Sequence, residues 1–573
     1  MYEFTNKEIA AILSELADLK QIKGENKYRV RAYSGAARRI TSIDEDLYDL
    51  VKEDRLQEIN GIGSGIAGTI REIFMDGVCT ELEELKTELP PGVREMINIP
   101  GIGPVRAHDF YYKLGVTGIA ELKEALQEEK IRKIKGYGKK TENKLLEFLE
   151  EYEQYRGKMF IPEALEICDR IRELTENLDG VERLEPAGDV RRRKESVGKL
   201  IFLIECKDRE QVISALTNLD EVIDIEKVEE SASYRAELTG GLLIYFYLTS
   251  REEFPLRLVN LTGSKSHFRC LQERAEELGR ELKEDVILED GNKVKITEEK
   301  ELYSELDLEY IIPELREDRG EIEAAKMREL PESIQLSDIR GDLHIHTDYS
   351  DGAYSLEQMV KACSDRGYSY MGITDHSRSL QVAHGLSVDR VYEQIREIER
   401  LQEKYDIQII SGIEADILLD GSLDYDDEVL SGFELVIASI HTGFGQSQEQ
   451  ITDRIISAME NDHVNIVAHP RGRILGRRSA YRVDMEKVIS SAASTGTSLE
   501  INASPYRLDL DDKLVRRAAD AGVKIAINTD AHHGDELEEM ALGVGVARRG
   551  WLEKDDVINT WQTEKLITYL RGE

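Results

Sequence analysis

Residues 340–573 repeat one arrangement, a short apolar run followed at once by histidine or acidic side chains. Runs of this length and composition are typical of buried strands. They span residues 370–373, 407–410, 435–440, 464–468 and 523–527. In a β-then-α series the C-terminal ends of the strands meet at one face, so the side chains that follow the runs should meet there too. The pattern therefore predicts a (β/α) barrel with an active site at that face.

The first cluster, residues 341–352, reads Gly-Asp-Leu-His-Ile-His-Thr-Asp-Tyr-Ser-Asp-Gly. Side chains alternate along a strand, so Asp342, His344 and His346 should share one face. Two imidazoles on one face, with the carboxylate of Asp351 close behind, suit a divalent metal ion. One His-x-His pair alone is as typical of structural histidines, but the later clusters favour a metal site.

This series of clusters resembles the PHP (polymerase and histidinol phosphatase) domain over residues 340–573. The resemblance implies a distorted (β/α) barrel that holds three divalent metal ions, zinc or manganese, and hydrolyses phosphoesters. The ligands that it implies, none of them substituted here, are His344, His346, Asp351, His376, Glu414, His441, His469, Asp530 and His532.

Four further side chains of this region are candidates for a catalytic role. Asp342 and Asp375 would orient histidine ligands, although either could be an ordinary hydrogen-bonding group at the barrel end. Arg471 and Arg473 follow His469 closely and would hold a substrate phosphate, with surface salt bridges as the alternative. We interpret the remaining histidines of the region as structural: His384, His463 and His533.

Length and composition limit the class of protein. A chain of 573 residues is too long for one core, so several domains are expected. The sequence has no apolar run long enough to span a membrane and no basic-then-apolar N-terminus, which predicts a cytoplasmic protein without a membrane partner. Its five scattered cysteines favour reduced thiols over disulfides or a cysteine-based zinc site. We expect a monomer.

The formal net charge of −38 opposes binding to nucleic acid, which needs local cations. Charge is an average over the surface, however, and local patches decide binding. Two basic clusters stand within the acidic whole: residues 191–194, and Arg471, Arg473, Arg477 and Arg478.

The N-terminal region, residues 3–149, has the pattern of a helical domain with three similar Gly-x-Gly turns between helices. Glycine permits the tight turn, and the bare N–H groups of the following helix can hold a backbone phosphate. Any one turn could be a simple helix cap, but three together resemble helix-hairpin-helix elements, which bind the DNA backbone without reading sequence. The glycines are Gly61 and Gly63, Gly101 and Gly103, and Gly136 and Gly138.

The first hairpin, with Lys27 and Tyr33 before it, resembles the 5′-phosphate-binding domain of family X DNA polymerases. Lys27 and Tyr33 are therefore candidate DNA contacts. That domain often carries a lyase whose lysine forms a Schiff base. Thr69 stands where this lysine belongs, so we expect lyase activity to be absent or weak.

Residues 156–315 resemble the palm and thumb of a family X polymerase, and the whole order of domains resembles the bacterial and archaeal PolX enzymes. The resemblance implies carboxylates that hold two magnesium ions for nucleotidyl transfer. Lys199, Ile201 and Tyr245 occupy the three carboxylate positions, so we expect no functional magnesium pair in the palm.

Two other parts of the nucleotide site also depart from the family. The triphosphate cradle reads Gly188-Asp189 in place of Gly-Ser, which puts an anion where an anion should bind. Before Gly263, the aromatic pair that lies along the sugar is replaced by Asn260 and Leu261.

We thus expect a multidomain α+β protein with the following parts: 1–82, a helical 5′-phosphate-binding domain; 83–155, a helical fingers-like domain; 156–252, a degenerate palm; 253–315, a thumb; 316–338, a linker; and 339–573, the PHP barrel. The expected function is hydrolysis of the phosphodiester at the 3′ end of gapped or nicked DNA by the barrel, as a metal-dependent 3′-5′ exonuclease. The alternatives are an active gap-filling polymerase with an editing barrel and a small-molecule phosphatase of the histidinol-phosphate type.

Overall fold

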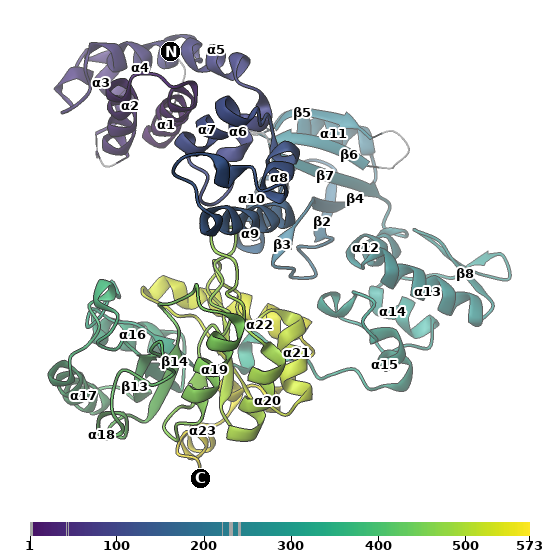
Figure 1. Ribbon diagram of the computed structural model, residues 1–573. Coiled ribbons are helices and arrows are strands. Elements are labelled where there is room, and N and C mark those ends of the chain that lie inside the picture. Colours follow the sequence, from purple (N-terminus) through teal and green to yellow (C-terminus); the bar gives the residue numbers. More distant parts are fainter. Residues whose placement is uncertain (1–3, 42, 44, 220–221, 229–232, 239–241) are drawn as a thin grey trace. The chain divides into compact units, whose positions relative to one another are not determined.

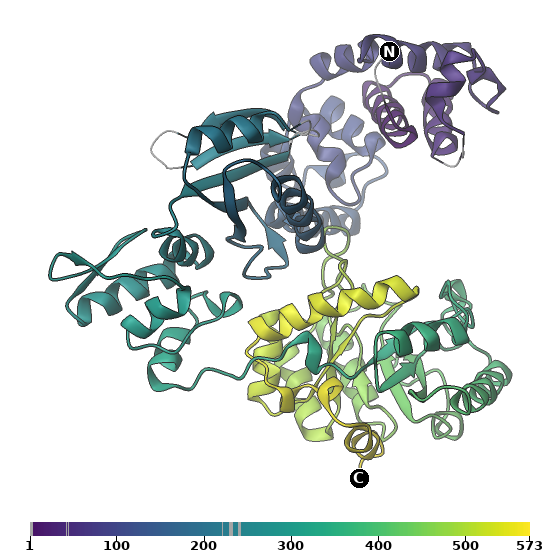
Figure 2. The ribbon, with the colours of Figure 1, turned by 180° about the vertical axis from the view of Figure 1, so that it is seen from behind.

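The computed structural model describes residues 4–41, 43, 45–219, 222–228, 233–238 and 242–573. The chain divides into two compact units, residues 1–156 with 476–479, and residues 157–475 with 480–573. Figures 1 and 2 show the helical first unit in purple and blue, and the sheets and barrel of the second in teal to yellow. Within the described residues, no helix combines the length and apolar composition that crossing a bilayer requires.

The first unit consists of helices around a core of aliphatic side chains. Its helices are α1 Asn6–Lys23, α2 Lys27–Ile40, α3 Leu47–Lys52, α4 Ser64–Asp76, α5 Thr80–Glu88, α6 Pro91–Glu95, α7 Pro104–Leu114, α8 Ile119–Gln127 and α9 Lys139–Tyr155. Helix α2 begins after Asn26, whose side chain accepts a hydrogen bond from the backbone N–H of Tyr28, and ends at its C-cap Thr41.

Each predicted hairpin glycine pair lies immediately before a helix. The first glycine of each pair has a left-handed φ: +88° at Gly61, +79° at Gly101 and +102° at Gly136. The second glycine is the N-cap of α4, α7 or α9 and has a negative φ. The turn itself therefore requires only the first glycine of each pair.

The palm is a sheet in which the described strands follow the order β2-β4-β7-β6-β5. They are β2 Val181–Ala187, β4 Leu200–Cys206, β5 Val222–Lys227, β6 Ser233–Leu238 and β7 Leu242–Thr249. The same region contains helices α10 Ile161–Thr175 and α11 Arg209–Thr217. A separate pair of short strands is formed by β1 Met159–Phe160 and β3 Ser196–Val197. Strands β4 and β7 run parallel, and Ile201 pairs with Tyr245. These two positions, expected from the family resemblance to belong to one site, therefore lie side by side on neighbouring strands.

The thumb has its own apolar core. It contains α12 Phe254–Thr262, α13 Lys265–Glu277, β8 Arg280–Leu282, β9 Ile287–Glu289, β10 Asn292–Lys293 and α14 Glu299–Glu305. Residues 316–338, expected as a linker, are partly folded: helix α15 spans Glu321–Met327, and Ala325 is buried in the thumb core.

Seven parallel strands form the C-terminal domain, paired in chain order from β11 to β17. They are β11 Gly341–Ile345, β12 Tyr370–Ile373, β13 Gln408–Asp416, β14 Leu435–Ser439, β15 Ile466–Val467, β16 Ser498–Asn502 and β17 Ile525–Asn528. A parallel bridge between Ile345 and Ala531 joins the two ends of the series. The predicted barrel is confirmed, and every predicted apolar run contributes residues to one of its strands.

Helices lie outside these strands, which explains why the strands read as continuous apolar runs (Figures 1 and 2). They are α16 Leu356–Asp365, α17 Val388–Gln402, α18 Asp427–Leu430, α19 Gln448–Met459, α20 Met485–Thr495, α21 Asp512–Asp520, α22 Met540–Arg549 and α23 Thr563–Leu570. The polar clusters therefore lie mainly in the loops that follow the strands.

Candidate metal centre

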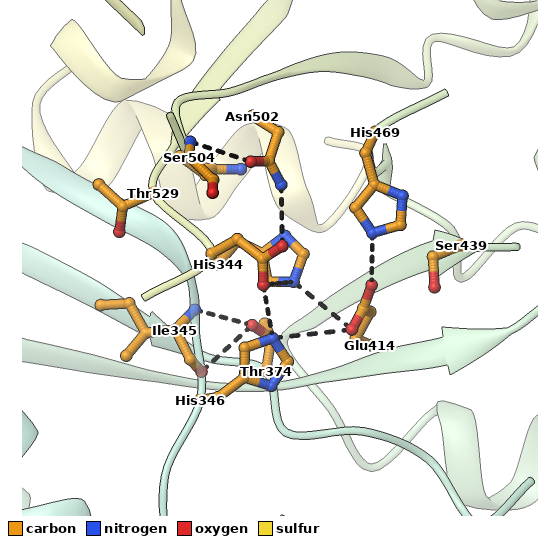
Figure 3. A network of polar contacts seen from close by, with 12 residues as sticks. His344, Ile345, His346, Thr374, Glu414, Ser439, His469, Asn502, Ser504 and Thr529 are labelled. Carbon is orange, nitrogen blue, oxygen red and sulfur yellow. Dashed lines mark hydrogen bonds and ion pairs between the residues drawn. The ribbon is translucent and has the colours of Figure 1, made fainter. Parts of the chain in front are cut away.

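The nine side chains predicted as metal ligands lie together at the C-terminal ends of the barrel strands. Three groups of them have potential ligand atoms within 4.8 Å of one another: His346, Asp351, His376 and His532; His344, His346 and Asp530; His376, Glu414 and His441. The ninth, His469, has Nε2 3.1 Å from Glu414 Oε1. Figure 3 shows His344, His346, Glu414 and His469 pointing toward one another; His344 lies in β11 and His346 directly after it, Glu414 lies in β13, and His469 follows β15.

Two buried carboxylates connect these groups. Asp530 Oδ1 lies 3.0 Å from His346 Nε2 and 3.5 Å from His344 Nε2. Glu414 Oε2 lies 2.7 Å from His376 Nδ1, while its Oε1 lies 3.4 Å from His441 Nε2. A carboxylate with imidazoles on both oxygens is suited to bridge neighbouring cations.

The donor set fits divalent metal ions. Six buried side-chain atoms of the cluster make no hydrogen bond to any part of the chain that the structure describes: His344 Nε2, His346 Nδ1 and Nε2, His376 Nδ1, Glu414 Oε2 and His469 Nδ1. Unpaired buried polar atoms are costly unless another partner satisfies them. Nitrogen and carboxylate donors together suit zinc or manganese.

The pKa values of the histidines are shifted in opposite directions within the cluster. Burial and the neighbouring His532 and His376 lower the pKa of His346 to about 3, so its ring is neutral, as a metal ligand must be. Burial also opposes charge on His441, but Glu414 and Asp416 outweigh it and raise its pKa to about 10. These carboxylates attract the positive charge that a metal ion would supply.

Asp342 and Asp375 do not orient histidine rings as we expected. Both are fully buried. Asp342 accepts hydrogen bonds from Thr529 and from the backbone N–H of His344, and burial raises its pKa to about 7. Asp375 accepts from the backbone N–H and hydroxyl of Thr347 and from Gln394, and burial raises its pKa. They stabilise the backbone beneath the ligands.

Two other carboxylates hold the ligand rings. Glu500 Oε1 lies 2.8 Å from His344 Nδ1, and Asp416 Oδ1 lies 2.7 Å from His441 Nδ1. Each contact fixes the ring so that its Nε2 faces the cluster. Asp416 could have been predicted from the sequence, because it lies two residues after Glu414 and therefore shares a strand face with it. Glu500 lies on β16, the strand that no predicted run covered.

Replacing Glu500 by glutamine is expected to weaken metal binding about 10- to 100-fold, the range found for partners of metal-bound histidines. Glu500 accepts hydrogen bonds from the side chains of Asn528 and Asn502 and from the backbone N–H of His469, besides contacting His344. Glutamine offers one acceptor oxygen to these donors. Competition with a chromogenic chelator measures the affinity, and thermal unfolding separates it from a folding defect; unchanged metal affinity would contradict the assignment.

The two arginines expected at the phosphate contact other groups. Arg471 Nη1 lies 2.7 Å from Asp511 Oδ2. Arg473 is buried, and it donates to the backbone carbonyls of Arg507 and Leu508 and to Glu195. Of the histidines interpreted as structural, His533 caps the short helix at Gly534–Glu539.

The palm positions lie together but offer no pair of carboxylates. Lys199 Nζ is 5.1 Å from the ring centre of Tyr245. A Cβ on Gly188 would lie 3.3 Å from Ile201 Cδ1, so an apolar side chain fills the space beside the cradle. Asp189 is paired with Arg192 and Lys194. Gly263 precedes α13, where a Cβ would lie 2.9 Å from His267.

The candidate DNA contacts of the first unit differ in exposure. Lys27 is exposed at the start of α2. Tyr33 is buried, and its hydroxyl oxygen lies 3.2 Å from Thr69 Oγ1. Thr69, which stands where the family resemblance implies a lysine, thus contacts Tyr33.

Four family models match the chain along its length. They are a helix-hairpin-helix domain at residues 4–79, a SAM-like helix-hairpin-helix tandem at 93–151, a DNA polymerase beta thumb at 257–317 and a PHP domain at 342–504. The chain thus combines the DNA-binding and thumb domains of a family X polymerase with a PHP domain.

Its relatives agree with this architecture. The DNA polymerase/3′-5′ exonuclease PolX of Bacillus subtilis (strain 168) is 37% identical over 574 residues, 99% of either protein. The chain therefore belongs to the PolX family, as the sequence predicted. The chain also matches shorter proteins named probable phosphatases, from Thermoanaerobacter sp. (strain X514) at 29% identity over 40% of this chain and 94% of the relative, and from Shewanella oneidensis at 27% over 38% and 86%.

Proposed function

We propose that this PolX-family protein hydrolyses the phosphodiester at the 3′ ends of gapped or nicked DNA, and that the PHP barrel holds its active site. The observation that carries this proposal is the gathering of nine nitrogen and oxygen side chains around buried atoms that make no hydrogen bond with the described residues. The proposed cofactor is three divalent ions, one for each of the three ligand groups, zinc or manganese by their chemistry.

The chain's own residues would prepare this reaction. When bound, divalent ions lower the pKa of water and neutralise charge on a phosphoryl group. Glu500 and Asp416 hold His344 and His441 in fixed orientation, so that binding costs little reorganisation. The buried networks of Asp342 and Asp375 keep the strand ends rigid.

We propose further that the palm is a platform without polymerase activity. Nucleotidyl transfer depends on positioned metals, and a lysine, an isoleucine and a tyrosine at residues 199, 201 and 245 cannot hold two magnesium ions. Asp189 replaces the serine of the triphosphate cradle and is paired with Arg192 and Lys194, so these groups are engaged with one another. Extension of a primer would instead favour the gap-filling alternative.

DNA binding would come from the hairpins of the first unit. At the second glycine of each hairpin a Cβ would meet nothing within 4 Å, and φ is negative, so the fold does not demand glycine there. A bare backbone at a helix N-terminus instead permits close approach of a phosphate. This supports Gly63, Gly103 and Gly138 as contacts with the DNA backbone.

Gly103→Ser is expected to weaken binding to a gapped duplex several-fold without lowering the melting temperature. Serine is a favourable N-cap residue, so α7 keeps its start while a side chain intrudes between helix and phosphate. Fluorescence anisotropy measures affinity, which should also fall steeply with salt. Ala120→Ser on the exposed face of α8 is the matched control; equal affinity for Gly103→Ser and the control would refute the hairpin as a contact.

Digestion of a 3′-labelled gapped duplex with and without manganese tests the proposed function. The expected result is metal-dependent release of the labelled nucleotide, with little hydrolysis of nitrophenyl phosphate. The reverse preference would favour a small-molecule phosphatase, the activity that the names of the barrel-only relatives suggest.

A further inference from the structure

One guanidinium lies against the metal centre without having been predicted there. Arg507 belongs to the turn that follows β16, and its side chain is 19% exposed. Its Nε lies 3.4 Å from Asp530 Oδ2, while the other oxygen of Asp530 faces His346 and His344. Arg507 thus reaches the centre from the side opposite these histidines.

The turn that carries Arg507 is fixed by buried contacts. Arg473 donates from Nε to the Arg507 carbonyl at 3.0 Å and also to the Leu508 carbonyl. The backbone N–H of Leu475 donates to the Tyr506 carbonyl at 2.7 Å. Because the backbone is held on both sides of Arg507, its side chain needs little ordering to meet a ligand.

Arg507 retains donors for a ligand. A guanidinium has five N–H groups in a planar fork. Among the described residues, Asp530 is its ion-pair partner through Nε, and neither terminal nitrogen makes a hydrogen bond. Arg471 and Arg473, by contrast, direct their side chains to Asp511 and to Glu195 and carbonyl groups.

Stabilisation of Asp530 does not by itself explain why an arginine stands at position 507. Asn502 Nδ2 already donates to Asp530 Oδ2 at 3.0 Å, a better hydrogen bond than the 3.4 Å contact of Arg507. A permanent positive charge beside a cation site also weakens metal binding. A cation in this position is useful where an anion binds next to the metal ions.

We propose that Arg507 is a catalytic residue that binds the phosphoryl group of the substrate at the PHP centre. This role rests on the proposed hydrolysis of phosphoesters. The two terminal nitrogens of Arg507 match two oxygens of a phosphate, and this bidentate contact depends on arginine geometry as well as charge. Arg507 takes the place that the sequence suggested for Arg471 and Arg473, and Arg473 acts through it by fixing its turn.

Binding of inorganic phosphate to the full-length manganese-loaded protein tests this role, followed by paramagnetic relaxation of the 31P signal. Arg507→Gln should raise the phosphate Kd about 10- to 100-fold, the range for loss of charged hydrogen bonds. Arg507→Lys should recover only part of the affinity, because lysine cannot form the fork. Manganese affinity should stay the same or rise, since a positive charge leaves the site.

Arg396→Gln on the exposed face of α17 removes the same charge far from this contact network and should leave phosphate binding unchanged. Equal phosphate affinity in wild type and Arg507→Gln would overturn the proposal. Loss of manganese from Arg507→Gln would also overturn it, because Arg507 would then be a support for Asp530. If phosphate binding depends on Arg507 but the protein releases no nucleotide from DNA, the proposed function fails while the role of Arg507 stands.

Discussion

His344→Ala and Asp530→Ala are each expected to reduce hydrolysis of a 3′-labelled gapped duplex by more than about 100-fold, beyond the loss caused by removing a partner of a metal ligand. His344 Nε2 and Asp530 Oδ1 belong to one ligand group, and both residues are buried where water could not easily replace them. DNA affinity should be nearly unchanged, because the hairpins that we propose as DNA contacts lie in the other unit of the chain.

Gel analysis of digestion and anisotropy measurements of binding separate these two effects. His463→Ala is the matched control, since His463 precedes β15 at one end of that strand while His469 follows it at the other. The control should keep wild-type turnover. Wild-type turnover by His344→Ala or Asp530→Ala would show that the active site lies elsewhere.

Template-directed primer extension should be undetectable for the wild-type protein and for His344→Ala, with all four deoxynucleotides and either magnesium or manganese. The variant matters because exonuclease activity could hide synthesis. Ile201 and Tyr245 pair across β4 and β7, and Lys199 lies over the Tyr245 ring. By the family resemblance these three positions would carry the metal carboxylates, and here they hold a lysine and two uncharged groups. Metal positioning supplies most of the catalysis in such a transfer.

If His344→Ala extended the primer and the double variant His344→Ala/Tyr245→Phe did not, the proposal of an inactive palm would be contradicted. A complementary test asks whether polymerase activity can be restored by placing Asp at 199, 201 and 245 and Ser at 189. A gain of slight activity would support the alignment of all four positions.

Part of the ligand cluster could be predicted from the sequence because several of its members, among them His376, His441 and His469, closely follow an apolar run that becomes a strand. The full set of nine was implied by the resemblance to the PHP domain. Residues 370–373 were predicted and form β12 with the same limits. Pattern and chemistry coincide at such places: the strand must be apolar to lie in a barrel, and its end must be polar to bind metal.

The groups that hold the ligands could not be predicted in this way. Strand β16 contains Ser498, Glu500 and Asn502, so it does not read as an apolar run, although all its residues are buried. Glu500 is tolerated there only because several donors from distant parts of the chain surround its carboxylate. Arg507 is a similar case, because its contact with Asp530 depends on how a turn folds back over the barrel end.

One incubation tests the central claim, that the barrel is the catalytic part of this chain. A 5′-labelled primer strand in a gapped duplex is mixed with manganese and all four deoxynucleotides, and wild type is compared with His344→Ala at equal metal concentration. The account predicts that wild type only shortens the labelled strand and that the variant leaves its length unchanged. Lengthening by either protein, or continued shortening by His344→Ala, would contradict it.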